Sequence, residues 1–181
     1  MAKLVSKTYG DALFAVSQEE GRIDEFFDAA KGVKEILKTN GEFGKLMNQP
    51  KLTKEEKAKI IEETFLDKIP KEMVGMLILL VKKGHAADII SVFDYFIKLV
   101  KEEKKIGQAH VVTATSLDDV QKQKIERRLL ETTKYETFEM DYQVDEALIG
   151  GMVIRIGDRV VDSSIQTKLY ELTRNLRNVQ V

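Results

Sequence analysis

"VDEALIGGMVIRIGDRVVDSSIQTKL", residues 144–169, places two adjacent glycines in front of an alternating apolar run. Alternation predicts β-strands over Met152–Ile156 and Arg159–Asp162, because successive side chains of a strand point to opposite faces. Gly157-Asp158 between these strands predicts a hairpin with a two-residue primed turn. The predicted register pairs Ile154 with Val161 and Ile156 with Arg159.

The end of this stretch predicts a helix. Ser163 and Gln166 have the spacing of a capping box, in which each side chain pairs with a backbone N–H of the first turn. Apolar residues then recur at helical spacing: Ile165, Leu169, Leu172 and Leu176. Asp162, Ser163 and Ser164 could also belong to a nucleophilic site. A helix start explains them better, since Asp and Ser satisfy unpaired N–H groups there.

The glycine pair does not match a phosphate-binding loop. A Walker loop needs a lysine and a hydroxyl directly after its last glycine, and Met152 follows Gly151 instead. A dinucleotide fingerprint needs three spaced glycines between a strand and a helix, which this order of elements does not provide. We therefore predict that Gly150 and Gly151 allow a bulge or a close approach of backbone where the strand begins.

Residues 106–181 as a whole predict a small mixed α/β domain in the order β-α-β-β-β-α. "AHVVTAT", residues 109–115, is typical of a half-buried strand. Ser116 with Asp119 predicts the start of a helix. The residues predicted to face inward from that helix are Leu117, Val120, Ile125 and Leu129. Alternation predicts the second strand over Phe138, Met140, Tyr142 and Val144.

Residues 1–105 have a helical period throughout, which predicts a six-helix N-terminal bundle. The first helix ends near Gly21, and one face of it carries Val5, Tyr9, Ala12, Leu13 and Val16. The second helix ends at Asn40-Gly41, and a short third helix covers Phe43 to Met47. A Thr53–Glu56 capping box opens the fourth helix. The fifth runs from Pro70 to Gly84, and the sixth carries Ile89 to Val100.

Composition and charge exclude several classes of function. Lys+Arg number 29 and Asp+Glu 30, so no basic surplus indicates nucleic-acid binding. The absence of cysteine excludes disulfides and thiolate chemistry. The longest apolar run, Met73 to Val81, is about half of the roughly 20 residues needed to span a bilayer. We expect a soluble protein without direct bilayer insertion.

No group of residues indicates catalysis, a cofactor or a metal ion. His85 and His110 fall in different predicted domains and lack the i, i+4 spacing of a helical metal pair. Carboxylates in "KEEKAKIIEE" alternate with lysines in a way typical of a solvated helix face. The residues alone predict a two-domain cytoplasmic interaction protein with no catalytic residue, no cofactor and no metal site.

The chain resembles the delta subunit of F-type ATP synthases, the counterpart of the mitochondrial oligomycin-sensitivity-conferring protein. "YGDALFAV" is similar to the family's N-terminal opening, with Gly10 in place of the usual alanine. "LMNQPKLTKEEKAKII" and "MLILLVKKGHAADIISVF" resemble its middle helices, with His85 where the family more often has arginine. The matching C-terminal positions are Val144, Asp145, Leu148, Gly150, Gly151, Met152, Ile154, Arg155, Gly157, Val161, Asp162 and Ser164.

The resemblance implies a non-catalytic stator subunit, present in one copy per complex and monomeric alone. Residues 1–105 are expected to bind the N-terminal helix of an alpha subunit, and residues 106–181 the C-terminal end of the peripheral-stalk b subunit. The catalytic head is thereby prevented from turning with the rotor. The implied location is the cytoplasmic face of the bacterial inner membrane. The motif residues expected to be mainly structural are Gly150, Gly151, Ile154, Arg155, Gly157, Asp162 and Ser164.

We expect the alpha-subunit helix to dock on the first helix, at Tyr9, Ala12, Leu13 and Val16. Tyrosine is amphipathic and stiff and often anchors interfaces. The small Gly10 and Ala12 beside it would let a partner helix approach closely. The residues alone support an ordinary core-edge role for Tyr9 equally well, and the resemblance favours the interface.

Two other functions stay open. One is an unrelated cytoplasmic helical adaptor or regulatory protein, which copurification with alpha and b chains would exclude. The other is a small enzyme with its site in the C-terminal domain, which would require a pocket of converging polar groups with perturbed pKa values.

Overall fold

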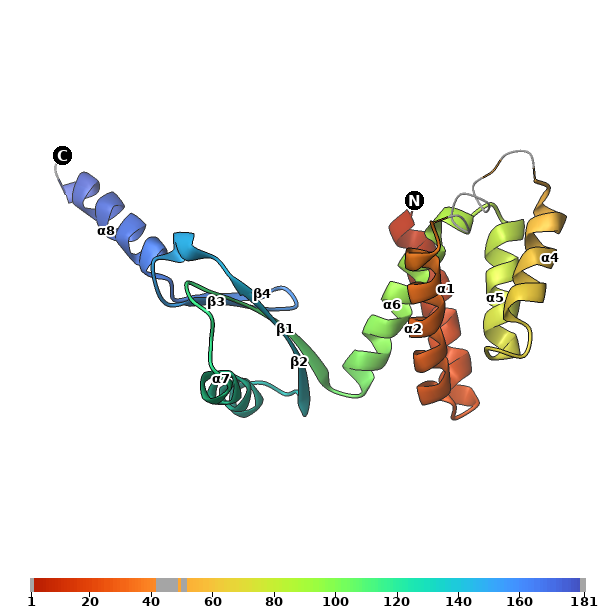
Figure 1. Ribbon diagram of the computed structural model, residues 1–181, viewed down its shortest axis with the longest axis horizontal. Coiled ribbons are helices and arrows are strands. Elements are labelled where there is room, and N and C mark those ends of the chain that lie inside the picture. Colours follow the sequence, from red (N-terminus) through yellow and green to blue (C-terminus); the bar gives the residue numbers. More distant parts are fainter. Residues whose placement is uncertain (1, 42–48, 50–51, 180–181) are drawn as a thin grey trace. The chain divides into compact units, whose positions relative to one another are not determined.

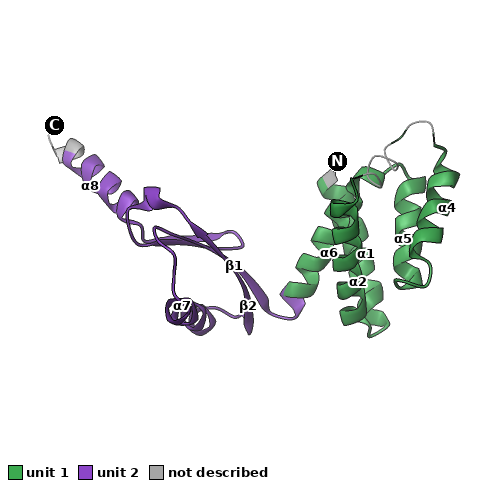
Figure 2. Cartoon of the chain, viewed as in Figure 1, with its two compact units in different colours: residues 1–101 green, residues 102–181 purple. Residues whose placement is uncertain are grey.

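The structure, a computed structural model, describes residues 2–41, 49 and 52–179 (Figure 1). The chain divides into two compact units, residues 1–101 and 102–181 (Figure 2). The first unit is helical, and the second combines helices with a four-stranded mixed sheet. The predicted fold class is confirmed at this level of detail. No helix within the described ranges is long and apolar enough to cross a lipid bilayer.

Unit 1, residues 1–101, takes its helices from the predicted helical region. Its elements are α1 (Ala2–Glu19), α2 (Ile23–Thr39), α4 (Lys54–Phe65), α5 (Lys71–Lys82), the short 3-10 turn η1 (Ala86–Asp88) and α6 (Ile89–Glu103). The predicted short helix at residues 43–47 lies outside the described residues. The capping box of α4 is confirmed, because Glu56 N–H donates to Thr53 Oγ1 (3.2 Å) and Thr53 N–H donates to Glu56 Oε2 (2.8 Å).

The helices of unit 1 bury their apolar faces in one core. Large side chains at its centre have almost no exposed surface: Phe26, Phe93, Phe96, Leu13, Ile61 and Leu77. Burying such aromatic and aliphatic groups is the main source of folding free energy, at about 1.5–3 kcal/mol for each side chain. The unit therefore has a core of its own.

Four of the five predicted positions of α1 pack in the core, Leu13 fully buried and Val5, Tyr9 and Val16 partly, but the fully buried face is turned from the predicted one. It runs through Ser6, Gly10, Leu13 and Ser17, whereas Ala12 is exposed. A pattern of apolar residues misses this face because two of its members are serines. Their hydroxyls donate to backbone carbonyls of the same helix, Ser6 Oγ to Lys3 O (3.2 Å) and Ser17 Oγ to Phe14 O (2.8 Å), so they can be buried without unpaired polar atoms.

Unit 2, residues 102–181, contains the sheet. Its elements are β1 (Ile106–Thr113), α7 (Asp119–Thr132), β2 (Thr137–Val144), the 3-10 turn η2 (Glu146–Leu148), β3 (Met152–Ile156), β4 (Arg159–Asp162) and α8 (Ile165–Val179). The strands lie in the order β2-β1-β3-β4. β1 pairs with β2 in parallel, which the α7 crossover makes possible, and the other pairs are antiparallel.

α7 covers one face of this sheet through a small core. Leu129 packs there with Ala109 and Phe138, and Ile125, Met140 and Ile154 lie around them. The predicted inward position of Val120 is wrong, since its side chain is 59% exposed. Val120 lies five residues before Ile125, a spacing that places it well away from the buried stripe of a helix with 3.6 residues per turn.

The start of α7 also differs from the prediction. Asp118 is the N-cap residue, not Ser116, and its carboxylate accepts a hydrogen bond from Gln121 N–H at 2.7 Å. The Gln121 side chain accepts one in return from Asp118 N–H at 3.0 Å. An ionised carboxylate is the stronger acceptor for an N–H group at a helix start, which explains why the helix begins at this residue.

Candidate functional site

Gly151 lies where two backbone segments approach each other closely, as predicted from the sequence. Its φ is +76°, and a Cβ placed there would lie 2.4 Å from the carbonyl oxygen of Ser163. Any larger residue would therefore suffer both a strained backbone and a clash with a backbone atom. The glycine brings the start of β3 against the residues that lead into α8.

Gly150 fixes the first turn of α8 from the same side. Its carbonyl accepts a hydrogen bond from Ile165 N–H at 2.9 Å. A Cβ on Gly150 would lie 2.6 Å from Ile165 Cδ1, so the small residue makes room for this side chain. The glycine pair thus holds the base of α8 against the sheet.

α8 is capped one residue later than predicted, by Ser164 instead of Ser163. The buried Ser164 hydroxyl accepts from Thr167 N–H at 3.2 Å, while Ser163 Oγ donates to Met152 O at 2.9 Å. The Asp162 carboxylate accepts from Ser164 N–H and from Thr167 Oγ1, both at 2.8 Å. These hydrogen bonds, the Ser164 backbone first, lower the pKa of Asp162. The groups that resembled part of a nucleophilic site build a helix start.

The other motif residues shape the sheet. The hairpin register is as predicted, with Ile154 opposite Val161 and Ile156 opposite Arg159. Gly157 supplies a φ of +56° in the turn. Ile154 packs toward the core under α7, and the exposed Arg155 lies opposite His110 of β1.

α8 carries an exposed apolar stripe. Figure 1 shows the helix extending away from the sheet, with its base near η2. The stripe consists of Ile165 (42% exposed), Leu169 (50%), Leu172 (58%) and Leu176 (69%). These positions are spaced 4-3-4, the spacing of a seam that packs against another helix. A row of leucines in water on one helix face is typical of a protein-binding surface.

The predicted partner-binding residues of α1 occupy different environments. Tyr9 and Val16 are half-buried and pack against the core of unit 1, and Ala12 is exposed. Leu13 is only 1% exposed, so it supports α1 from inside the unit. Gly10 does not provide room for a partner, because a Cβ there would lie 2.5 Å from the Tyr95 ring of α6.

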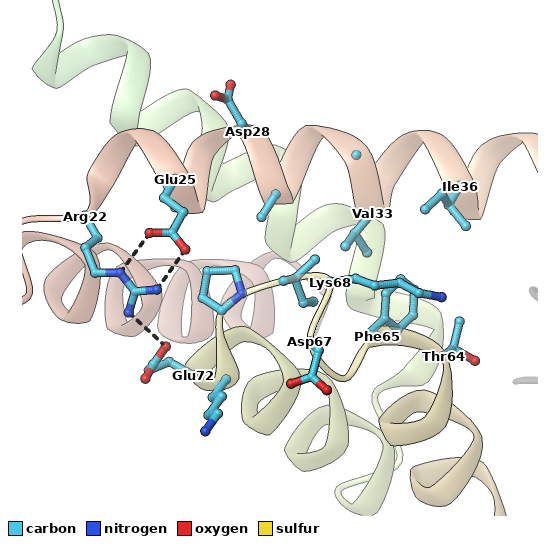
Figure 3. A pocket seen from close by; sticks show the side chains of 15 residues that line it. Arg22, Glu25, Asp28, Val33, Ile36, Thr64, Phe65, Asp67, Lys68 and Glu72 are labelled. Atoms are coloured by element: carbon cyan, nitrogen blue, oxygen red, sulfur yellow. Dashed lines mark hydrogen bonds and ion pairs between the residues drawn. The ribbon is translucent and has the colours of Figure 1, made fainter.

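α1 and α5 lie side by side and run in opposite directions. Arg22, just after α1, forms an ion pair with Glu72 in the first turn of α5 at 3.7 Å (Figure 3). The Tyr9 ring, in the middle of α1, lies 6.4 Å between centroids from the ring of His85, just after α5. Exposed apolar residues occur on both helices: Leu4, Ala12 and Ala15 on α1, and Leu79 on α5. We call these four residues with Tyr9 the α1–α5 surface.

Leu4 and Leu79 were missed as candidate binding residues. Leu79 lies inside the apolar run "MVGMLILLV", and its 43% exposure distinguishes it from the buried Leu77 and Leu80 of the same run. For α8 the stripe itself was predicted, but a helical period cannot tell whether an apolar face packs inside the chain or against a partner.

Each histidine pairs with a nearby carboxylate. His85 Nδ1 lies 3.2 Å from Asp88 Oδ2, and His110 Nδ1 lies 2.8 Å from Asp141 Oδ2. The second pair is well solvated, since 77% of the Asp141 side chain is exposed. Such pairs are typical of a protein surface.

Comparison with known proteins gives a consistent result. Residues 5–176 match the family model described as ATP synthase delta (OSCP) subunit. The ATP synthase subunit delta of Lachnoclostridium phytofermentans is 45% identical over 181 residues, covering 100% of both chains. The subunit delta of Desulforamulus reducens is 31% identical, covering 95% of this chain and 94% of its own.

A solved structure has the same fold. A chain of the Toxoplasma gondii mitochondrial ATP synthase hexamer, determined by cryo-EM, matches with a TM-score of 0.76 at 20% identity. The match covers 94% of this chain and 96% of that one. From the family match along almost its whole length, the chain belongs to the ATP synthase delta (OSCP) subunit family.

Proposed function

We propose that this chain, a delta-type stator subunit of an F-type ATP synthase, links the catalytic head to the peripheral stalk through one surface on each unit. The observation that carries the proposal is the exposed stripe of α8, Ile165, Leu169, Leu172 and Leu176. Apolar side chains at this spacing contribute a favourable free energy only when a partner helix covers them and removes them from water. Neither an unrelated adaptor nor an enzyme is favoured, given the family.

The peripheral-stalk b subunit is the proposed partner of unit 2. The 4-3-4 spacing of the α8 stripe suits a helix that packs alongside it as in a coiled coil. The C-terminal end of b would supply that helix. The residues around Gly151 and Asp162 hold the base of α8 rigidly, so a load applied to the helix would pass into the sheet.

An alpha-subunit N-terminal helix is the proposed partner of unit 1. It would lie along the α1–α5 surface, where Leu4, Ala12 and Leu79 are exposed and the Tyr9 ring lies at the edge of the core. When a helix binds in a groove in this way, apolar contacts at helical spacing supply the affinity. Tyr9 and Ala12 would contact the alpha helix, while Leu13 and Val16 hold α1 in place.

The proposed mechanism is mechanical and uses no catalytic residue or cofactor of this chain. One copy of the chain would bind alpha and b at the same time. The catalytic head would then be held against the torque of the rotor, so that rotation of the rotor strains the catalytic sites. We place this work at the cytoplasmic face of a bacterial inner membrane, which the chain reaches through the complex.

Titration calorimetry with a soluble C-terminal fragment of the same organism's b subunit tests the α8 surface. The double variant Leu169→Asp, Leu172→Asp should lower the affinity by about tenfold or more, since it places charge in an apolar seam. Tyr170→Asp is the matched control, because Tyr170 is 68% exposed but lies off the stripe. Equal affinities of the wild type and the double variant would refute the α8 assignment.

A further inference from the structure

The sheet of unit 2 has a long free edge, which is formed by β2. This strand lies at the end of the order β2-β1-β3-β4 and pairs only with β1 (Figure 1). Its register with β1 is unbroken over all eight residues of the strand, without a bulge, and the strand contains no proline. No backbone hydrogen bond joins its outer side to another described residue. Such an edge exposes N–H and C=O groups with which a further strand can pair.

The outward N–H groups of β2 can be identified from its pairing with β1. Asp145 N–H donates to Thr113 O at 2.8 Å, on the side of the chain that faces β1. Successive N–H groups of a strand point to opposite edges, so that of Asp141 also faces β1. The N–H groups of Met140 and Tyr142 therefore point away from the sheet, at the centre of the free edge.

Two carboxylates lie beside this edge. Glu139 and Asp141 are exposed and alternate with Phe138 and Met140, which pack in the core under α7, so both acids lie on the opposite face of the sheet. The Asp141 side chain is 77% exposed although it pairs with His110. β2 itself contains no basic residue. A strand with Lys or Arg opposite these carboxylates would gain ion pairs across the edge, whereas an acidic strand would be repelled.

The same charges disfavour pairing with a second copy of this chain. Two β2 strands paired at their centres would bring Glu139 and Asp141 of one copy against the same carboxylates of the other, and like charges directly opposite each other destabilise a sheet. Charged residues on an edge strand commonly prevent association of this kind. The acidic pair therefore selects a partner of opposite charge.

The other face of β2 offers apolar surface to an added strand. Met140 is half-buried beside the small core of unit 2, and Val144 is 50% exposed. Lys122 of α7 lies over the Tyr142 ring, with its Nζ 5.6 Å from the ring centre. Apolar side chains that alternate with the basic ones would thus continue the apolar face of the sheet.

We propose that β2 is a site of strand addition, where an extended protein segment that alternates Lys or Arg with apolar residues pairs with the free edge. Its basic side chains would lie opposite Glu139 and Asp141, and its apolar side chains would lie beside Met140 and Val144. This site goes beyond the proposed function, because it uses neither the α1–α5 surface nor the α8 stripe and binds an extended chain instead of a helix.

Hydrogen exchange of the full chain, followed by NMR with a synthetic peptide present, tests the proposal. The probe is a capped peptide in which lysine and valine alternate, and its matched control has glutamate in place of each lysine. At a saturating concentration of the lysine peptide, the amides of Met140 and Tyr142 should exchange about tenfold more slowly, because they become hydrogen-bonded. The glutamate peptide should leave them unchanged. Amides of β4, the other edge strand, should respond to neither peptide.

Two charge-reversed variants separate recognition at β2 from general attraction between charges. Asp141→Lys should weaken binding of the lysine peptide about fivefold or more in titration calorimetry, since an attraction becomes a repulsion. Asp158→Lys is the matched control, with the same change of charge in the exposed turn between β3 and β4, and should bind nearly as the wild type does. Circular dichroism should show that both variants are folded. Unchanged exchange of the wild-type Met140 and Tyr142 amides, equal protection by the glutamate peptide, or equal loss of affinity in both variants would overturn the proposal.

Discussion

The two units of this stator subunit differ in how completely they bury their apolar surface. Unit 1 surrounds a large core with aromatic side chains such as Phe26, Phe93 and Phe96 at its centre. In unit 2, α7 covers one sheet face over a small core built on Leu129 and Phe138, while the α8 stripe is exposed. The proposed function accounts for the difference: unit 1 encloses a core of its own, whereas a partner helix would complete unit 2.

The largest expected effect is on the core of unit 1. Phe93→Ala should lower the free energy of unfolding of this unit by about 4 kcal/mol, because it removes a fully buried ring and leaves a cavity. Hydrogen exchange followed by mass spectrometry should show faster exchange throughout α1, α2, α5 and α6. Exchange in the sheet should be unchanged, and equal acceleration there would show that the two units unfold together.

A comparable effect in unit 2 is expected at the base of α8. Gly151→Val should lower the free energy of unfolding of the unit by about 3 kcal/mol, since it combines a positive φ with a clash against Ser163 O. Gly157→Val is the control, with a φ of +56° but open space around the Cβ, and should cost less. Urea unfolding of both variants checks the order. Tight magnesium-dependent ATP binding by the wild type would contradict the structural role of the glycines.

A smaller effect concerns the α1–α5 surface. Tyr9→Ala should weaken binding of an alpha N-terminal peptide by about 1 kcal/mol or more, as removal of an interface anchor does. Titration calorimetry measures the affinity, and circular dichroism should show that the helices are retained. A folded variant with unchanged affinity would remove Tyr9 from the site, and an unfolded one would assign it to the core.

The smallest effect is a pH dependence at the start of α8. Asp162 has a pKa below its ordinary value of 3.8, because the ionised form accepts hydrogen bonds from Ser164 and Thr167. Its stabilisation is therefore complete above about pH 4 and is lost as the pH falls through the lower, folded-state pKa. The protection factors of the amides in the first turn of α8, which correct for the pH dependence of intrinsic exchange, should fall over this range. Asp162→Asn should exchange faster at neutral pH and lose this dependence.

The sequence predicted the elements whose residues follow one simple period. The β3–β4 register and the Thr53 capping box are confirmed, since alternation and cap chemistry are local properties. The buried face of α1 was not predictable from apolar spacing, because Ser6 and Ser17 are buried through hydrogen bonds to their own helix. The N-cap residues of α7 and α8 are Asp118 and Ser164, which differ from the predicted ones, because several residues that can cap a helix lie within a few positions there.

The candidate site was less predictable for a physical reason. The stripe of α8 has the same spacing whether it packs inside the chain or against a partner, so the sequence could not show that it is exposed. The ion pair of Arg22 with Glu72 joins distant parts of the chain, and no local pattern links these two residues.

Hydrogen exchange of the full chain with and without the b-subunit fragment tests most directly whether a partner completes unit 2. Amides of α8 should exchange about tenfold or more slowly when the fragment is bound, because its helix would cover the stripe. Amides of α1 and α5 should be unaffected. Unchanged exchange in α8, with protection elsewhere at a saturating concentration of the fragment, would contradict this account.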